Sequence, residues 1–409
     1  MTAAAQIDKS AQTRNLVLAT VAFTITFWAW NLIAPLATFY AGSEQMSLDA
    51  TQKSILIAVP ILVGSLGRIV VGVLTPRFGG RVMFTVLLLI SAPFVLLVAV
   101  AGSLKSFPMM IVIGFFLGIA GTSFAAGIPF LNSWYEAHRR GFATGIFGAG
   151  MGGTALSAFF TPRFREWFGY FPTHVVIAVA LVAMAAVCWT FMRDAPSWSP
   201  NTEPAFPKLF DAMKLPITWQ MSFLYAAAFG GFVAFSTYLP TYLADVYDIV
   251  DLKSAGARTA GFAIAAVIAR PLGGVLSDKF GPRIITAISC GGAAVLAVWM
   301  ISKPDVHTGL AAVDFILMAL MMGMGSGAVF AWVAVASPPA RVGAVTGVVG
   351  AAGGLGGFFP PLVMGATYNA DAHSYTIGLA LLVAFAAVAC LFTLFGIPRS
   401  ADEKEKAAA

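Results

Sequence analysis

Long apolar stretches separated by short polar connections make up almost the whole chain. Twelve such stretches of about 20 residues occur, and they begin near residues 16, 55, 82, 109, 141, 174, 218, 260, 284, 310, 343 and 375. An α-helix of that length crosses the roughly 30 Å hydrocarbon core of a bilayer. The strict alternation over about ten residues that marks a strand of a membrane barrel is absent. The pattern therefore predicts an all-α polytopic membrane protein with twelve transmembrane helices.

Composition excludes an ordinary soluble domain. Apolar residues make up 59% of the chain, charged residues only 10%, and the mean hydropathy is +0.86. The three cysteines, Cys188, Cys290 and Cys390, lie in apolar stretches without the spacing of metal ligands, so we interpret them as small core residues. We expect neither a metal nor a cofactor.

The distribution of basic residues predicts the orientation in the membrane. Of the 24 Lys and Arg residues, 15 lie on the side of the two termini and 7 on the opposite side, and the other two are Arg68 and Arg270. Because cytoplasmic connections carry the excess of positive charge, both termini should face the cytoplasm. No cleavage signal follows the first apolar stretch, which we expect to remain as an anchor. No basic run interleaved with aromatic residues suggests nucleic acid.

Arg68 and Arg270 interrupt apolar, membrane-length stretches, and they lie 202 residues apart. Placing a charge in hydrocarbon costs roughly 2.5 to 3.5 kcal/mol, so a charge at this depth indicates function. We find no acidic residue in the middle of any predicted helix, the nearest being Asp314 at the outer start of the tenth. The arginines therefore lack an obvious counter-ion, which predicts that they bind an anion from solution and favours exchange over uniport. The alternative is that they extend to the interface without binding anything.

Each arginine begins a near copy of one segment, because residues 68–81 align with residues 270–283 without a gap. The same offset relates the segment 139–152 to the segment 341–354. The duplication predicts two six-helix bundles, residues 1–192 and 217–409, joined by a proline-rich cytoplasmic linker at 193–216. An even number of helices in each half gives both halves the same orientation, so an axis along the membrane normal should relate them.

The connection that follows each arginine resembles the cytoplasmic loop motif of the major facilitator superfamily, Gly-x-x-x-Asp-Arg/Lys-x-Gly-x-Arg. Charges in this motif can meet a neighbouring helix end and stabilise one conformation, which we call the conformational latch. Pro76 occupies the position of the expected Asp in the first copy. The alternative is that these are only the basic charges of cytoplasmic loops. The candidate latch residues are Gly72, Arg77, Arg81, Asp278, Lys279 and Arg283.

Glycines recur on one face of the fifth and eleventh predicted helices. Such a face permits close helix packing, and it also permits the halves to rock past one another. Aromatic residues beside the predicted cavity could sandwich a flat anion whose edge is gripped by guanidinium groups. Our candidates for this role are Phe124, Tyr225 and Phe229. The signature glycines are Gly145, Gly148, Gly152, Gly347, Gly350 and Gly354.

The chain resembles the nitrate/nitrite porter family of the major facilitator superfamily over nearly its whole length. The segments that carry the resemblance are Ile61–Arg68, Phe124–Trp134, Gly145–Gly150 and Gly347–Phe359. The resemblance implies that Arg68 and Arg270 are paired substrate-binding residues and that Phe124, Tyr225 and Phe229 are cavity aromatics. One departure is Met151, which stands where the family commonly has Asn. Another polar contact would then come from Asn31, Asn132, Ser133 or Thr144.

These observations predict a transporter of small inorganic anions, nitrate or nitrite or both, that works by alternating access. We expect a monomer in the lipid bilayer of the bacterial inner membrane, and we expect no enzymatic activity. Cyanate, a small carboxylate or an organic phosphate remain alternative substrates, and proton coupling remains open. A receptor or enzyme that does not transport is the alternative from another class. No set of Ser, His and acidic residues supports it.

Overall fold

The computed structural model describes residues 8–136, 139–201, 205–306, 309–338 and 341–398. Within these residues, twelve helical segments are long and apolar enough to cross a membrane, and each predicted stretch coincides with one of them. They are Lys9–Ala41, Ala50–Phe78, Gly80–Ser103, Phe107–Trp134, Phe142–Phe168, Tyr170–Phe191, Pro216–Tyr247, Leu252–Phe280, Pro282–Ile301, Leu310–Ala336, Val342–Ala366 and Thr376–Gly396. The prediction of a twelve-helix membrane protein is confirmed.

Short turns of a different pitch divide several of these segments, so the structure contains more helices than membrane crossings. The first half of the chain holds α1 (Lys9–Trp30), η1 (Ala34–Leu36), α2 (Ala37–Ala41), α3 (Ala50–Phe78), α4 (Gly80–Ser103), α5 (Phe107–Leu117), η2 (Gly118–Thr122), α6 (Ser123–Trp134), α7 (Arg140–Gly148), η4 (Ala149–Gly152), α8 (Gly153–Phe168) and α9 (Tyr170–Phe191). The second half holds α10 (Ala205–Met213), α11 (Pro216–Tyr225), η5 (Ala226–Gly230), α12 (Gly231–Tyr247), α13 (Leu252–Phe280), α14 (Pro282–Ile301), α15 (Leu310–Ala336), α16 (Val342–Gly356), α17 (Phe359–Ala366), α18 (Thr376–Leu391) and η6 (Phe392–Gly396).

Helices α3 and α13 carry the two membrane arginines and have matching construction. Each is 29 residues long, begins after an aspartate that caps the first turn, and ends at a glycine with positive φ. Asp49 accepts a hydrogen bond from the Gln52 amide, and Asp251 accepts from the amides of the first turn of α13. Arg68 and Arg270 are each the nineteenth residue of their helix. The equal caps and lengths therefore place both charges at the same depth.

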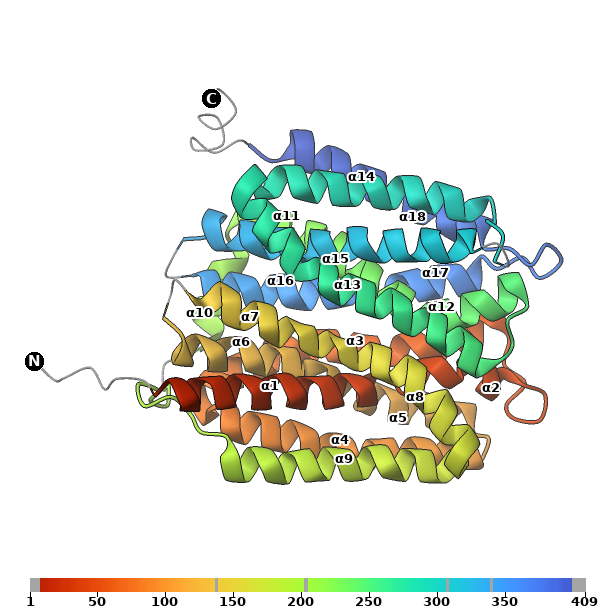
Figure 1. The fold of residues 1–409 in the computed structure, drawn as a ribbon, viewed down its shortest axis with the longest axis horizontal. Helices are drawn as coiled ribbons and strands as arrows, with labels where there is room; N and C mark the ends of the chain where they lie inside the picture. The colour runs from red at the N-terminus through yellow and green to blue at the C-terminus, as the bar shows by residue number, and fades with distance from the viewer. Residues whose placement is uncertain (1–7, 137–138, 202–204, 307–308, 339–340, 399–409) are drawn as a thin grey trace, which may run out of the picture.

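Helices of four membrane segments form most of the interface between the first and second halves of the chain. Helix α3 packs against α16 and α17, and α8 packs against α13. Figure 1 shows α4 and α9 side by side at one edge of the molecule, with α14 and α18 at the opposite edge. Each arginine helix therefore packs against a helix of the other half, α3 against α16 and α17, and α13 against α8.

The predicted linker at 193–216 contains the short helix α10, and its residues 202–204 lie outside the described part of the chain. The C-terminal tail beyond residue 398 also lies outside it. The division into halves at 1–192 and 217–409 stays a prediction. The terms first half and second half of the chain refer to these two ranges.

Candidate functional site

Arg68 of α3 lies at the centre of the molecule with only 1% of its surface exposed. Its Nε donates a hydrogen bond to the Gly121 carbonyl oxygen at 3.3 Å, and its Nη1 donates to the Gly350 carbonyl oxygen at 3.0 Å. Gly350 belongs to α16, so this bond crosses between the halves. The remaining nitrogen, Nη2, is buried and has no hydrogen-bond partner among the described residues. A buried donor without a partner is costly, so Nη2 is well suited to bind a ligand oxygen.

Arg270 of α13 reaches the same region from the other half. Its Nη2 donates a hydrogen bond to the Tyr225 hydroxyl at 3.0 Å, and its Nη1 lies 2.7 Å from the Met151 sulfur. A thioether sulfur is a weak acceptor, so Met151 satisfies Nη1 poorly. Among the ion pairs of the described residues, none includes Arg68 or Arg270. A buried and a partly buried positive charge therefore lie close together, and no carboxylate of the described residues neutralises them.

Phe124 and Phe229 lie between the two arginines. The guanidinium carbon of Arg68 is 5.4 Å from the centroid of each ring, and that of Arg270 is 5.8 Å from Phe124 and 5.6 Å from Phe229. Tyr225 stacks on Phe229 with a centroid distance of 4.9 Å and an interplanar angle of 2°. The structure thus brings together the five residues that we predicted to bind substrate. Aromatic faces stabilise the two cations where no carboxylate is present.

Phe330 of α15 also belongs to this cluster, and the sequence analysis missed it. Its ring lies 4.6 Å from that of Tyr225 and 6.3 Å from that of Phe124, and the Arg270 guanidinium lies 5.4 Å from its centroid. The available signal was the run of small residues at 325–328, which resembles the surroundings of Phe124. The aromatic cluster of the site is therefore Phe124, Tyr225, Phe229 and Phe330.

The signature glycines divide into two groups. A methyl group added at Gly350 would contact Phe124, and one added at Gly354 would collide with Ser65. A methyl group added at Gly148 would lie 3.6 Å from Arg270 Nε. These glycines permit helices and the arginine to approach closely. A methyl group on any of the remaining three would meet nothing within 4 Å; these are Gly145, Gly152 and Gly347. Close packing therefore explains only three of the six signature glycines.

The loop-motif arginines contact helices of their own half. Arg81 Nε donates to the Trp189 carbonyl of α9 at 2.9 Å, and its guanidinium lies 4.5 Å from the Trp189 ring centroid. Arg283 donates to carbonyls at the end of the last helix, including that of Ile397 at 2.8 Å. Asp278 is exposed, as are Lys279 and Arg77, and Gly72 is partly buried against α6. The predicted latch between conformations stays a prediction.

An acidic group lies close to the position where Pro76 replaces the expected Asp. The Asp194 carboxylate accepts a hydrogen bond from the Gly80 amide at 2.6 Å and a longer one from the Arg81 amide, at the N-terminus of α4. Burial raises the pKa of this carboxyl group, and the two amide hydrogen bonds oppose that rise. Asp194 thus supplies an acid to the first copy of the motif from outside it.

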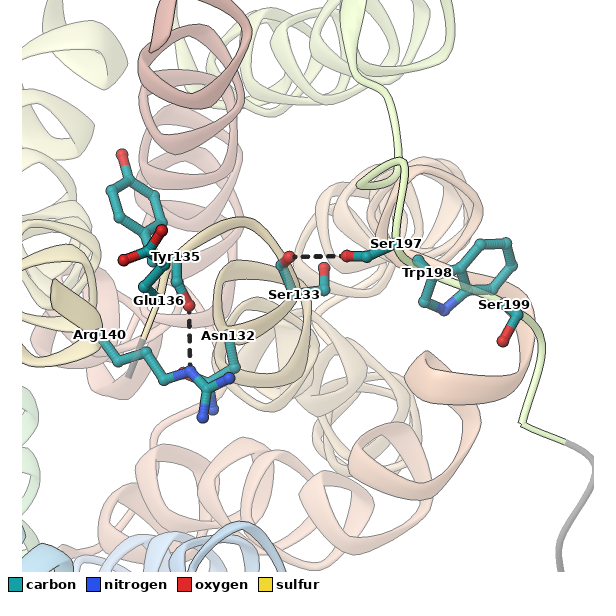
Figure 2. A pocket seen from close by; sticks show the side chains of 8 residues that line it. All are labelled: Asn132, Ser133, Tyr135, Glu136, Arg140, Ser197, Trp198 and Ser199. Atoms are coloured by element: carbon teal, nitrogen blue, oxygen red, sulfur yellow. Dashed lines mark hydrogen bonds between the residues drawn. The ribbon is translucent and has the colours of Figure 1, made fainter. Parts of the chain in front are cut away.

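Two of the polar residues considered as substitutes for the missing Asn line a separate hollow. Figure 2 shows Asn132 and Ser133 beside the chain at 197–199, in a hollow of about 450 Å³ that also includes Arg140. Thr144 donates to the Arg140 carbonyl, and the Asn31 side-chain amide nitrogen lies 3.4 Å from the Thr154 carbonyl oxygen. Asn132 and Ser133 therefore lie in this hollow instead of among the five predicted site residues.

The interface between the halves is closed at the end away from the termini. Lys53 of α3 pairs with Asp245 of α12 at 2.8 Å, with side-chain exposures of 9% and 15%. Ser54 and Tyr238 hydroxyls lie 2.8 Å apart beside this pair, and Tyr375 donates to Asp245. We call Lys53, Ser54, Tyr238, Asp245 and Tyr375 the closure cluster. Because this pair is largely buried and its neighbours are hydrogen-bonded, breaking it should destabilise the contact between the halves more than breaking an exposed ion pair would.

Toward the termini the same helices diverge. On α13, a methyl group on Gly256 would collide with the Ala158 carbonyl of α8, whereas one on Gly274 would meet nothing within 4 Å. On the α16–α17 segment, Gly365 is pressed against Ser54, whereas Gly347 and Gly343 face open space. The site therefore lies between a closed end and an open end.

A chain with twelve membrane helices, two matched halves and a central site between them is a secondary transporter of the major facilitator type. It matches the Major Facilitator Superfamily over residues 19–361 and 250–409. A solved bacterial homologue of the human lysosomal transporter Spinster, in an inward-facing and occupied conformation, superposes with a TM-score of 0.72 at 18% identity, covering 95% of this chain and 97% of that one. A D-xylose–proton symporter gives 0.71 at 14% identity, with coverages of 94% and 98%. These two likenesses concern the fold alone.

Proteins of similar sequence identify the family within this superfamily. A probable nitrate/nitrite transporter of Mycobacterium tuberculosis is 56% identical over 382 residues, which cover 93% of this chain and 96% of that protein. A nitrite extrusion protein of Bacillus subtilis is 32% identical over 90% of each chain. A probable nitrate/nitrite antiporter of Thermus thermophilus is 34% identical over 88% of this chain and 86% of that protein. The chain belongs to the nitrate/nitrite porter family, a family of transporters and not of enzymes.

Proposed function

We propose that this protein exchanges nitrate and nitrite across a bacterial inner membrane by alternating access, and that Arg68 and Arg270 bind the anion. The observation that carries the proposal is the convergence of two arginines, one from each half, on the same two aromatic rings without a carboxylate partner among the described residues. The names of the curated relatives support the choice of anion.

The shape and charge of nitrate and nitrite suit this arrangement. Both are flat and singly charged, and a planar guanidinium fork can bind two oxygens of such an anion at once. Arg68 Nη2 is buried without a partner, and Arg270 Nη1 has only the Met151 sulfur. The rings of Phe124 and Phe229 would flank the anion and exclude water. A tetrahedral, doubly charged anion would fit between two flat rings less well.

Alternating access follows from the contrast between the two ends of the interface. If both termini are cytoplasmic, as the excess of basic residues on that side supports, the closure cluster seals the outer face and the cavity opens inward. Transport then requires the outer contacts to break and the inner ends of α3, α8, α13 and the α16–α17 segment to meet. The glycines that now face open space would come into contact in that second state. We propose that the chain carries this out as a monomer.

Exchange, and not free uniport, follows from the charges. At an assumed separation of about 8 Å and an effective dielectric constant of about 20, two unit positive charges repel each other by roughly 2 kcal/mol. An empty carrier would have to bring the arginines together against this repulsion. A bound anion neutralises part of it, so the loaded carrier should reorient faster than the empty one.

Exchange of labelled nitrite in proteoliposomes tests the proposal. The full chain is reconstituted, and uptake of labelled nitrite is measured against vesicles that contain nitrite, nitrate, cyanate, formate, phosphate or no permeable anion. We expect rapid uptake against internal nitrate and nitrite and little uptake into empty vesicles. The conservative variant Arg14→Lys, at an exposed position of α1, serves as a control for reconstitution. No response to nitrate or nitrite would refute the substrate, and steady net flux without an internal anion would refute obligatory exchange.

A further inference from the structure

Asp314, in the second turn of α15, is a carboxylic acid for which the anion site provides no role. Its exposed surface is 0%, and both carboxyl oxygens are buried without a hydrogen-bond partner among the described residues. From the sequence, Asp314 is expected at the outer start of the tenth membrane helix, too far from its middle to neutralise the arginines. An ionised carboxylate in such a place would carry a large desolvation penalty, whereas the neutral acid would not.

The described groups around Asp314 offer no positive charge to compensate an ionised form. Two phenols of α12 lie nearby, because the ring centroids of Tyr242 and Tyr247 are 6.2 Å and 6.5 Å from that of Phe315, the residue that follows Asp314. The other acid of this region, Asp305, lies in the loop that precedes α15. The Tyr247 hydroxyl is buried as well. The protonated carboxyl group is neutral, so it is penalised less by burial in these surroundings than the ionised form.

The cations at this end of the neighbouring helices are engaged elsewhere. On α13, Lys253 pairs with Glu166 at 2.8 Å and Arg258 donates to Ser254. After α14, Lys303 donates to the carbonyl oxygens of Ala372 and His373 at 2.9 Å. The described cations that α13 and α14 bring to this end therefore already have other partners.

Asp314 is connected to the closure cluster through one aromatic side chain. The ring centroid of Tyr242 is 6.2 Å from that of Phe315, which follows Asp314 in the chain, and 5.7 Å from that of Tyr375. Tyr375 donates to Asp245, which pairs with Lys53 across the two halves. When this end of the interface opens, α12 parts from α3, and we expect water to reach the tyrosines of α12 that lie beside Phe315 and Asp314. Burial of Asp314 and closure of this end are therefore linked.

We propose that Asp314 is a proton-binding site, protonated while the end away from the termini is closed and ionised when that end opens to water. The proton enters from water on that side during closure and returns to the same side during opening. Since the acid stays covered while the other end is open, no proton crosses the membrane. Acidic conditions on that side therefore favour the closed state. The inference rests on the proposed alternating access but not on the identity of the anion.

Infrared spectroscopy tests the protonation state without any transport measurement. The full chain in lipid vesicles should show, at neutral pH, a carbonyl stretching band of a buried carboxylic acid that resists deuterium exchange. Asp314→Asn should remove this band, and the matched variant Asp305→Asn should retain it. The amide of Asn has the size and neutrality of the protonated acid, so the fold should tolerate it. The proposal is overturned if the wild-type band is missing or survives in Asp314→Asn.

Distance measurements between spin labels test the link to closure. Labels are placed at the exposed positions 44 and 250, in a background lacking Cys188, Cys290 and Cys390. Raising the pH should lengthen the distance in the wild type and leave it short in Asp314→Asn. Asp314→Glu should restore a pH-dependent shift. Equal pH dependence in the wild type and Asp314→Asn, or a shift that follows sodium instead of pH, would overturn the proposal, even if nitrate exchange is intact.

Discussion

Arg68 and Arg270 occupy the same position in helices of equal length, yet their partners differ in kind. Arg68 is held by two backbone carbonyls, one of which belongs to the opposite half. Arg270 is held by two side chains, a phenol and a thioether. Backbone carbonyls move only when a helix moves, whereas side chains can rotate. Duplication therefore explains the equal depth of the two charges. The different partners leave the Arg270 side chain freer to move than that of Arg68.

The comparison suggests a division of labour between the two proposed substrate-binding arginines. Arg68 would keep a fixed direction and sense the relative position of α3 and α16. Arg270 would follow the anion, because its two bonds can be exchanged for bonds to a ligand without moving a helix. Each of the variants below tests one side of this comparison.

The largest effect is expected for Arg68→Lys. A lysine cannot donate to two carbonyl oxygens and an anion in the fixed fork of a guanidinium. Losing two charge-assisted hydrogen bonds should lower the initial rate of nitrite exchange by about 100-fold, at about 1.5 to 3 kcal/mol for each such bond and partial replacement by the ammonium group. Exchange in proteoliposomes measures it. A rate within a few-fold of the wild type would rule out direct anion contact by Arg68.

Arg270→Lys should lose most transport too, but less than Arg68→Lys. The bonds to Tyr225 and Met151 are replaceable, and the ammonium group would keep its charge between the same rings. We expect a loss of about 10-fold or more, because one charge-assisted bond is worth at least about 1.5 kcal/mol. Expression and the distance between spin labels serve as controls for folding. A loss equal to or greater than that of Arg68→Lys would contradict the difference proposed here.

Tyr225→Phe removes the hydroxyl group that accepts from Arg270 and keeps the ring stacked on Phe229. A single neutral acceptor contributes about 0.5 to 1.5 kcal/mol, so exchange should fall by about two- to tenfold. Tyr225→Leu, which also removes the stacked ring, should lose more. If both variants had the same rate, stacking with Phe229 would have no part in the site.

Met151→Asn should have the smallest effect on rate and the clearest effect on selectivity. The amide oxygen would accept from Arg270 better than sulfur does, and the amide NH₂ could donate to a third oxygen, which nitrate has and nitrite lacks. We expect the ratio of nitrate to nitrite exchange to rise by about twofold or more, since one hydrogen bond is worth about 0.5 to 1.5 kcal/mol. Competition between the two anions for labelled nitrite uptake measures the ratio. A lower ratio would contradict this interpretation.

The membrane helices and the arginine pair were predictable because local properties determine them. Length and apolarity mark a membrane helix, and a duplicated arginine is visible by alignment of the chain with itself. Phe330 could not be singled out from the sequence, because most aromatic residues in such a chain face lipid or core. The closure cluster was also missed. Lys53 and Asp245 are 192 residues apart and occur in stretches where a charge near a helix end has no special meaning.

Asp314 shows a further limit of the sequence analysis. Its place in the fifth position of α15 indicated the interface region of the membrane, where a carboxylate is usually hydrated. In the fold, Asp314 is fully buried on the helix that packs against α12 and its tyrosines. No property of the residues near Asp314 in sequence predicts that arrangement.

The π-helical turn at Ala226–Gly230 changes the phase of the seventh membrane helix. An α-helix advances by about 100° per residue, so one extra residue in a turn rotates everything beyond it by that angle. Tyr225 and Phe229 can thereby face the arginines while Tyr238 and Asp245, farther along, face α3. Deleting Ala227 should restore the α-helical pitch and turn Tyr238 and Asp245 away from Lys53 and Ser54 of α3. One membrane segment therefore presents two functional surfaces, one toward the arginines and one toward α3. The extra residue of the π-helical turn sets the angle between these surfaces.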